Sequence, residues 1–275
     1  MKITQFYKNE DIRLGIIQDQ ELIPLDFKGD MVEFIRSGQE YTLSKDKREL
    51  TDIKLAAVVS TPQKIIAIGL NYQDHVQESK GPIPELPIIF AKFQNTLIGS
   101  NELIKWDPAI TREVDYEAEL AVIIGQKTFN CPEHKAMESV YGYTCANDVS
   151  ARDLQFGDVQ WVRGKSLDTF CPIGPWIVTA DEISDPHNLI IKCILNGQVM
   201  QDSNTSQMIF KIPYLISFIS KHITLSPGDV ILTGTPSGVG RFRKPRVLLK
   251  EGDEVTVEIQ GIGKLTNRCR TISLS

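Results

Sequence analysis

Two glutamates, Glu117 and Glu119, stand two positions apart at the start of an apolar run. The run is DYEAELAVIIG, residues 115–125. It predicts a strand, and because residues two apart on a strand share a face, both carboxylates are expected to point the same way. Neighbouring carboxylates repel unless a cation or a proton neutralises them, which favours a hard divalent metal ion at this place. A solvated strand start is the alternative interpretation of these two residues.

A third carboxylate, Asp148, lies in the segment ANDVSAR, residues 146–152, where a strand is expected to give way to a helix. Loops at strand ends commonly carry function, although Asp148 could instead cap the helix. Three carboxylates without a nearby histidine or cysteine suit Mg²⁺, Mn²⁺ or Ca²⁺ better than Zn²⁺. We therefore predict a metal site made of Glu117, Glu119 and Asp148.

Three further segments contain residues suited to catalysis or substrate binding. His75 and Glu78 are three positions apart in a segment expected to be helical, so Glu78 could orient the imidazole as a general base. Such pairs are also common on solvated helices. Lys165 offers a cation for an acidic substrate, and the loop GTPSGVG, residues 234–240, offers backbone donors. That loop lacks the P-loop and dinucleotide-binding spacings, and a plain turn after a strand is its alternative interpretation.

The overall composition favours small-molecule chemistry. The 275-residue chain is 41% hydrophobic and 24% charged, with a net charge of −5 and no long single-sign block, which argues against a nucleic-acid or anionic-membrane partner. No apolar run approaches the roughly 18 residues of a membrane span. We expect a cytoplasmic protein, or one in an organelle matrix if a transit peptide is removed. Five cysteines without a C-x-x-C pair predict reduced thiols.

The elements that must position these residues are mostly strands. Residues 1–60 are expected to form a small N-terminal α/β appendage, and residues 61–275 the catalytic domain. Asn196 and Gly197 form a type I′ hairpin signal, which favours antiparallel pairing. The predicted strands cover residues 3–6, 14–18, 21–25, 64–68, 87–92, 117–124, 142–146, 176–179, 189–195, 230–233, 254–260 and 263–270. The predicted helices cover residues 31–36, 71–79, 132–140, 149–157 and 206–221.

Taken together, the motifs resemble those of the fumarylacetoacetate hydrolase family, in order, over residues 64–270. The segment from 185 to 208 resembles one subgroup of that family in particular. The motifs that carry the resemblance are GLNY (69–72) through His75, DYEAE (115–119), NDVSARD (147–153), GKS (164–166), DTF (168–170), GDVILTGTP (228–236) and GD (252–253).

The resemblance implies a mixed, mainly β fold with a β-roll-like catalytic domain, usually in a homodimer. It assigns a divalent cation to the three carboxylates, with Mg²⁺ or Mn²⁺ expected and Ca²⁺ as an alternative. His75 and Glu78 match the base and its orienting partner. Lys165 and Gln155 would face the substrate or the metal's waters. Gly234 and Thr235 would hold a carboxylate or enolate oxygen of the substrate.

Three reactions are compatible with this site, because a metal that binds a 2-keto or 2,4-diketo acid stabilises an enolate. We rank hydrolysis of a carbon–carbon bond in an acylpyruvate-type substrate first. The alternatives are an oxaloacetate keto–enol tautomerase, and a decarboxylase or isomerase of a dicarboxylic keto acid. A non-catalytic protein that binds metal and keto acid is the alternative of another class. The family's namesake uses an additional aspartate ligand near the position of Leu70, which makes fumarylacetoacetate itself a poor candidate substrate.

Overall fold

Two β-sheets form most of the computed structural model, which describes residues 1–38 and 41–273. Within these residues the larger sheet has 11 strands, in the order β4-β3-β2-β1-β13-β11-β10-β16-β5-β6, and β7 also pairs with β13. Their bounds are β1 Lys2–Lys8, β2 Asp11–Gln18, β3 Glu21–Pro24, β4 Arg48–Glu49, β5 Ile65–Gly69, β6 Ile88–Lys92, β7 Leu97–Ile98, β10 Ala118–Ile124, β11 Val140–Asn147, β13 Cys171–Thr179 and β16 Val230–Leu232.

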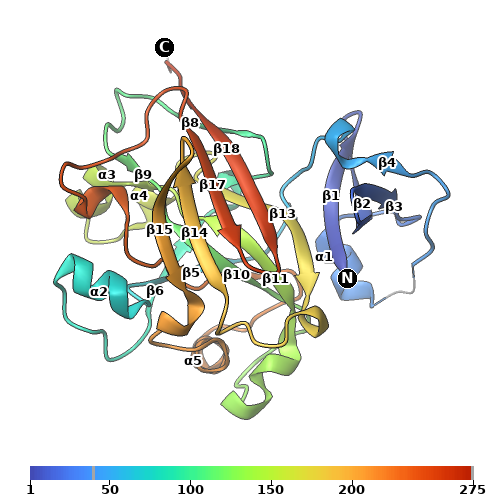
Figure 1. Ribbon diagram of the computed structural model, residues 1–275. Helices are drawn as coiled ribbons and strands as arrows, with labels where there is room; N and C mark the ends of the chain where they lie inside the picture. Colours follow the sequence, from blue (N-terminus) through green and yellow to red (C-terminus); the bar gives the residue numbers. More distant parts are fainter. Residues whose placement is uncertain (39–40, 274–275) are drawn as a thin grey trace.

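The second sheet has five strands in the order β15-β14-β17-β18-β8. Figure 1 shows β14, β15, β17 and β18 lying across β10, β11 and β13, and residues of β10, β11 and β13 contact β14, β17 and β18. One hydrophobic cluster therefore lies between the sheets, and a second, which includes Met31, Val32 and Phe34, covers the other face of the larger sheet. The bounds are β8 Leu103–Trp106, β14 Ile190–Leu195, β15 Gln198–Asn204, β17 Glu254–Ile259 and β18 Gly263–Thr271, and a separate pair joins β9 Val114–Asp115 to β12 Ser150–Ala151.

The strand that follows Glu117 is the most buried part of the fold. Every residue of β10 is buried, because the strand pairs with β11 on one side and β16 on the other and is covered on both faces. Such a strand reads as a continuous apolar run, as the sequence indicated. The expected hairpin is also confirmed: Asn196 and Gly197 both have positive φ and join the antiparallel strands β14 and β15. The mainly β fold class is thus confirmed.

Several predicted helices differ in type or length. The segment 132–140 forms a 3₁₀ helix, η3 Glu133–Ser139, after Pro132, which makes no side-chain cap. The helix predicted from 149 begins at Arg152, because Ser150 and Ala151 pair as β12. The other helices are α1 Met31–Ser37, α2 Gln73–Ser79, α3 Arg152–Gly157, α4 Val162–Lys165 and α5 Ile212–His222, with 3₁₀ turns η1 Leu50–Asp52, η2 Gln94–Thr96, η4 Ala180–Glu182, η5 Thr205–Gln207 and η6 Gly240–Phe242.

The N-terminal strands β1 to β4 lie beside the main body in Figure 1. They join the large sheet where Lys2 and Ile3 of β1 pair with Val178 and Ile177 of β13. The division into an appendage of residues 1–60 and a catalytic domain of residues 61–275 stays a prediction. Within the described residues no helix is long and apolar enough to cross a membrane. All five cysteines are free, as expected.

Candidate active site

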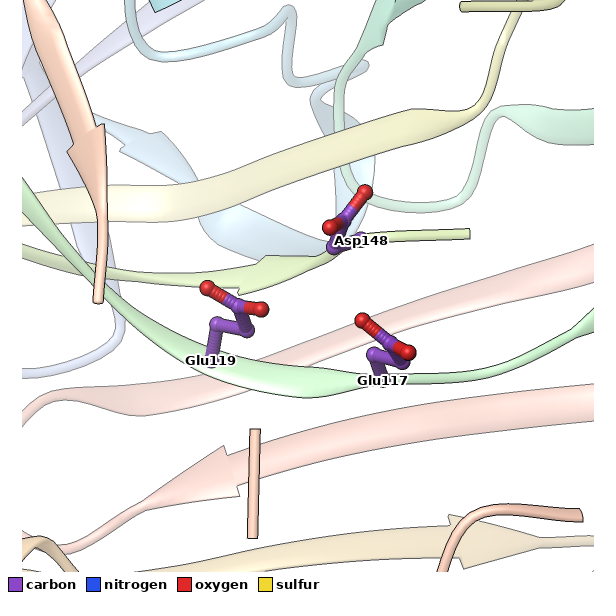
Figure 2. Close-up of side chains that lie close together, drawn as sticks. All are labelled: Glu117, Glu119 and Asp148. Atoms are coloured by element: carbon purple, nitrogen blue, oxygen red, sulfur yellow. The ribbon is translucent and has the colours of Figure 1, made fainter. Parts of the chain in front are cut away.

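Glu117, Glu119 and Asp148 meet at one end of β10 and β11. Glu119 lies on β10, Glu117 directly precedes this strand, and Asp148 directly follows β11. Figure 2 shows their carboxyl groups pointing into the same space. All three side chains are buried, and one oxygen from each lies within 4.8 Å of the others. The structure therefore brings together the three carboxylates that the sequence singled out.

Hydrogen bonds of the main chain hold this group in place. The Glu117 N–H donates to Oδ1 of Asn147 over 3.0 Å, and the Asp148 N–H donates to the carbonyl of Glu117 over 2.9 Å. The two segments are thus tied together at the positions that carry the carboxylates. A shift of one strand relative to the other would break both bonds.

Three basic side chains surround the carboxylates. Lys165 Nζ lies 2.8 Å from Oε2 of Glu117 and 2.7 Å from Oδ2 of Asp148. Arg152 bridges two acids, with Nη1 2.7 Å from Oε1 of Glu117 and Nη2 2.8 Å from Oδ2 of Asp115. A third cation, Lys92, contacts Asp148 from β6. Each of these contacts is buried, so the ion pairs are weakly screened.

With all of its groups ionised, the buried cluster carries an excess negative charge that either a cation or protonation of one carboxylate must remove. Four carboxylates, the fourth being Asp115, face three basic groups and leave one negative charge. Burial, followed by repulsion from Asp148 and Glu117, raises the pKa of Glu119 well above its usual 4.5. Burial also opposes ionisation of Glu117, but Lys165 and Arg152 outweigh it and lower the pKa of this group to about 2. A set of oxygen ligands with excess negative charge fits a hard divalent cation.

The predicted base and its partner are in hydrogen-bond contact. His75 lies on α2, and its Nδ1 is 3.2 Å from Oε2 of Glu78, one helical turn away. Glu78 is itself fixed, because its Oε1 accepts a hydrogen bond from the Gly238 N–H over 2.9 Å. This contact favours the tautomer with the proton on Nδ1 and leaves Nε2 as an acceptor. His75 is 6% exposed, so the pair is not the solvated surface pair of the alternative interpretation.

The three predicted substrate-binding residues lie beside the same carboxylates, but much of their hydrogen-bonding capacity is already used. Gln155 accepts a bond from Nη1 of Arg152 over 2.9 Å. The Gly234 N–H donates to Oε2 of Glu119 over 2.7 Å, and Oγ1 of Thr235 donates to the carbonyl of Ala118 over 2.9 Å. Gly234 has φ +97°, and a Cβ there would lie 2.8 Å from Cβ of Asn71, so glycine is required for this close approach.

A cavity of about 340 Å³ joins these groups. Its wall includes His75, Glu117, Glu119, Gln155, Lys165 and Thr235. Aromatic side chains complete the wall, namely Phe90, Phe156, Trp161 and Phe242. A cavity of this size with an apolar wall and a few convergent polar groups suits a small organic acid.

The sequence analysis did not single out Lys92, Arg152 or Arg241. Lys92 and Arg152 contact the carboxylates, and Arg241 lines the cavity. Arg152 belongs to the motif that contains Asp148, so its position was available as a signal. Lys92 is a lone charge at the end of the apolar strand IIFAK, which is itself a signal because a buried lysine needs a partner. Arg241 lies in a loop with other basic residues, and the sequence offers no signal that separates it from them.

Comparison with known proteins agrees with the motif analysis. A family model described as "Fumarylacetoacetate (FAA) hydrolase C-terminal" matches residues 64–270, the span over which the motifs run. Among solved structures, "Fumarylacetoacetate hydrolase (EaFAH) from psychrophilic Exiguobacterium antarcticum" has a TM-score of 0.90 and 36% identity, over 99% of this chain and 100% of that chain. The expected family resemblance and fold are therefore confirmed.

Two curated relatives are more similar in sequence. "Oxaloacetate tautomerase FAHD2A, mitochondrial" of Bos taurus is 49% identical over 249 residues, which are 86% of this chain and 79% of that protein. "Oxaloacetate tautomerase fahd2, mitochondrial" of Xenopus laevis is 53% identical over 219 residues, which are 79% of this chain and 68% of that protein. Both names belong to the subgroup of fumarylacetoacetate hydrolase domain-containing protein 2, which is the subgroup that residues 185–208 resemble.

Proposed function

Because the chain belongs to the fumarylacetoacetate hydrolase family, we propose that it is a metal-dependent tautomerase that interconverts the keto and enol forms of oxaloacetate. The observation that carries this proposal is that His75, Glu117 and Glu119 line one cavity. Asp148 lies beside the two glutamates, and Glu78 contacts His75. The names of the relatives at 49% and 53% identity support tautomerisation over the carbon–carbon hydrolysis that the sequence analysis ranked first.

Glu117, Glu119 and Asp148 would hold the cation, and their oxygen donors suit Mg²⁺ or Mn²⁺, with Ca²⁺ as an alternative. When bound, the cation supplies Lewis-acid stabilisation for negative charge on the keto oxygen of the substrate. With all four carboxylates ionised, two positive charges would turn the net charge of the buried cluster from −1 to +1. A positive cavity attracts an anionic keto acid.

Tautomerisation moves protons only. One proton leaves C3 of the keto form, one reaches the oxygen on C2, and no carbon–carbon bond breaks. Nε2 of His75 is the proposed acceptor of the C3 proton, because Glu78 holds Nδ1. Lys165 would hold the reacting end of the substrate, and it is already ordered by Glu117 and Asp148. Gln155, ordered by Arg152, would contact the substrate beside it.

Gly234 and Thr235 keep their proposed role as substrate-binding residues through a different donor. The Thr235 hydroxyl already donates to the carbonyl of Ala118, and the Gly234 N–H already donates to the carboxylate of Glu119. Within the described residues the main-chain N–H of Thr235 has no hydrogen-bond partner, and Thr235 lines the cavity. This N–H is therefore the donor that we assign to a substrate oxygen.

Hydrolysis of an acylpyruvate remains the second candidate, because the solved structure with a TM-score of 0.90 is named a hydrolase. In that reaction His75 would take a proton from water instead of from C3, and the water would attack a distal carbonyl. Loss of carbon dioxide from oxaloacetate is the decarboxylase outcome. Binding of keto acid without turnover is the outcome expected of a non-catalytic relative.

The deciding assay follows the ultraviolet absorbance of the oxaloacetate enol with Mg²⁺ or Mn²⁺, with and without EDTA. A matched blank contains the ion without protein, since free ions also act on keto acids. We expect the protein to speed enol decay without forming pyruvate. EDTA and the Glu119→Gln change should both abolish this activity. The control Glu258→Gln, which alters a surface pair with Lys264, should retain it. Cleavage of acetylpyruvate, or pyruvate from oxaloacetate, with no tautomerisation would contradict it.

The expected homodimer and cellular location are part of the same proposal. Light scattering should give twice the 30.9 kDa mass of the chain. The cytoplasmic location stays a prediction, while the names of both relatives contain the word mitochondrial. Fractionation of cells that express the tagged native protein distinguishes the two compartments.

A further inference from the structure

Arg241, on the turn η6, lies at the wall of the same cavity and has no part in the chemistry described above. We propose that Arg241 is a specificity-determining residue that binds the distal carboxylate of a dicarboxylic keto acid. The inference rests on the proposed function, since it names the substrate feature that the same site selects. It assigns to this loop a role that neither the motifs nor the candidate metal site requires.

The position of Arg241 is fixed by its main chain. The N–H groups of Gly240 and Arg241 donate to the two carboxylate oxygens of Asp115 over 2.8 and 3.0 Å. The same carboxylate binds Nε of Arg152 over 2.9 Å. A Cβ on Gly240 would overlap the main-chain carbonyl oxygen of Val247 and would lie 2.6 Å from Oδ1 of Asp115, so only glycine allows this approach. The loop is therefore held against the residues that precede Glu117.

The side chain of Arg241 is held in place but keeps free donors. Its Nη1 lies 2.6 Å from Oε2 of Glu113, and its guanidinium lies 4.6 Å from the ring centre of Phe156, which also lines the cavity. Within the described residues, Nε and Nη2 have no hydrogen-bond partner. In Arg163 the same two atoms, Nε and Nη2, form the edge of the guanidinium that donates to both carboxylate oxygens of Asp158, over 2.7 and 2.5 Å.

The other cations at the cavity wall are already paired. Arg152 is shared between Asp115 and Glu117, and Lys165 between Glu117 and Asp148. Arg241 is thus the cavity-lining cation, among the described residues, that keeps a complete bidentate edge unpaired. A side chain that is 24% exposed and stacked on an aromatic ring loses little further freedom when it binds an anion.

A dicarboxylic keto acid needs such a group. Its first carboxylate adjoins the keto group and belongs with the reacting end of the site. Its second carboxylate would be costly to bury without a cation. A planar guanidinium binds a carboxylate through two parallel hydrogen bonds, which adds direction to the attraction. Arg241 therefore favours a dicarboxylic over a monocarboxylic keto acid.

The chain offers a matched control in Arg246. Its Nη1 lies 3.1 Å from the other oxygen of Glu113, and its side chain is 50% exposed and does not line the cavity. Arg246→Met removes the same charge from the same acidic partner. Glu113 keeps one arginine in either single variant, which preserves its local structure.

The experiment compares Arg241→Met, Arg241→Lys and Arg246→Met with the native chain, each loaded with Mn²⁺. Enol decay is measured with oxaloacetate and with its 4-methyl ester, in which a neutral ester group replaces the distal carboxylate. We expect Arg241→Met to raise KM for oxaloacetate at least about tenfold and to leave KM for the ester unchanged, because one charged hydrogen-bonded contact is lost. The KM of Arg241→Lys for oxaloacetate should lie between those of the native chain and Arg241→Met. The KM of Arg246→Met should equal that of the native chain.

A binding measurement separates this inference from the proposed function. Calorimetry compares 2-oxoglutarate with 2-oxopentanoate, which has a methyl group in place of the distal carboxylate. The inference is supported if the native chain binds 2-oxoglutarate more tightly than 2-oxopentanoate and Arg241→Met abolishes this difference. This support holds even if the native chain leaves the oxaloacetate enol unchanged, a result that would contradict the proposed function alone. Equal affinity for both acids, no binding of either, or an equal loss on both kinetic substrates overturns the role of Arg241.

Discussion

Nζ of Lys92 lies 2.6 Å from Oδ1 of Asp148, and neither side chain has exposed surface. Because Lys165 takes the other oxygen, Oδ2, over 2.7 Å, the carboxylate of Asp148 is divided between two lysines. Lys92 also donates to the carbonyl of Val149 over 3.3 Å and contacts the carbonyl of Lys165. This lysine therefore fixes both the side chain and the following main chain of a candidate metal ligand.

Lys92→Met should destabilise the protein by about 3 kcal/mol, because it removes one of the two lysines that neutralise the buried Asp148 and leaves Oδ1 of this carboxylate without its ion-pair partner. Adding Asp148→Asn should restore much of the loss, since the pair then contains no charge. Urea denaturation of both single variants and of the double variant measures the coupling. Lys192→Met, which breaks an exposed pair with Asp202, is the control and should cost less than about 1 kcal/mol.

A Lys92→Met variant as stable as the Lys192→Met control would contradict this account. So would a double variant whose loss equals the sum of the two single losses, because two residues that do not interact lose stability additively.

Glu119→Gln should lower the affinity for Mn²⁺ by at least about tenfold while leaving the metal-free fold intact. The pKa of Glu119 is raised, by burial first, so in the absence of a cation the neutral form is favoured and glutamine reproduces it. Glutamine also keeps the acceptor for the Gly234 N–H. Calorimetry gives the affinity, and thermal unfolding in EDTA should give an equal or higher midpoint. Unchanged Mn²⁺ binding would remove Glu119 from the ligand set.

His75→Ala should reduce kcat by about 10²-fold or more and change KM little, because a general base acts on the reacting proton and contributes little to binding. Glu78→Gln should have a smaller effect, since it keeps a side chain of the same size but orients the imidazole less strongly. The enol-decay assay measures both. An unchanged kcat in His75→Ala would refute the assigned base, whichever member of the family's reactions this chain catalyses.

The sequence predicts the parts of the site that depend on local patterns. The apolar run after Glu117 identifies a buried strand, and the spacing of Glu117 and Glu119 places two carboxylates on one face. The motif that contains Asp148 supplies the third. These features are readable because strand periodicity and short motifs act over a few residues.

Interactions between distant residues explain what the sequence could not predict. Lys92 is 56 positions from Asp148, and Arg241 is 128 positions from Glu113, so no local pattern marks either pair. The predicted helix from 206 begins only at Ile212 for a similar reason. Oδ1 of Asn71 accepts from the Phe210 N–H, and its Nδ2 donates to the carbonyl of Phe210, which holds that segment out of the helix.

His187 should make stability depend on pH. Its Nε2 accepts a hydrogen bond from the Ile212 N–H over 3.1 Å. Burial first, and then the charge of Lys211, lower the pKa of His187 below the usual 6.5, and together they outweigh the opposing effect of Asp185. The unfolded chain therefore binds the proton more readily than the folded one, so this contribution is present above pH 6.5 and is lost as the pH falls below it. Thermal midpoints between pH 8 and pH 5 should fall less steeply for His187→Gln, whose amide oxygen accepts the same bond but does not titrate, than for the native chain. In Lys211→Met the thermal midpoint should also fall less steeply with decreasing pH than in the native chain, because the charge that lowers the pKa of His187 is gone. Identical profiles for all three proteins would show that His187 is not the titrating group.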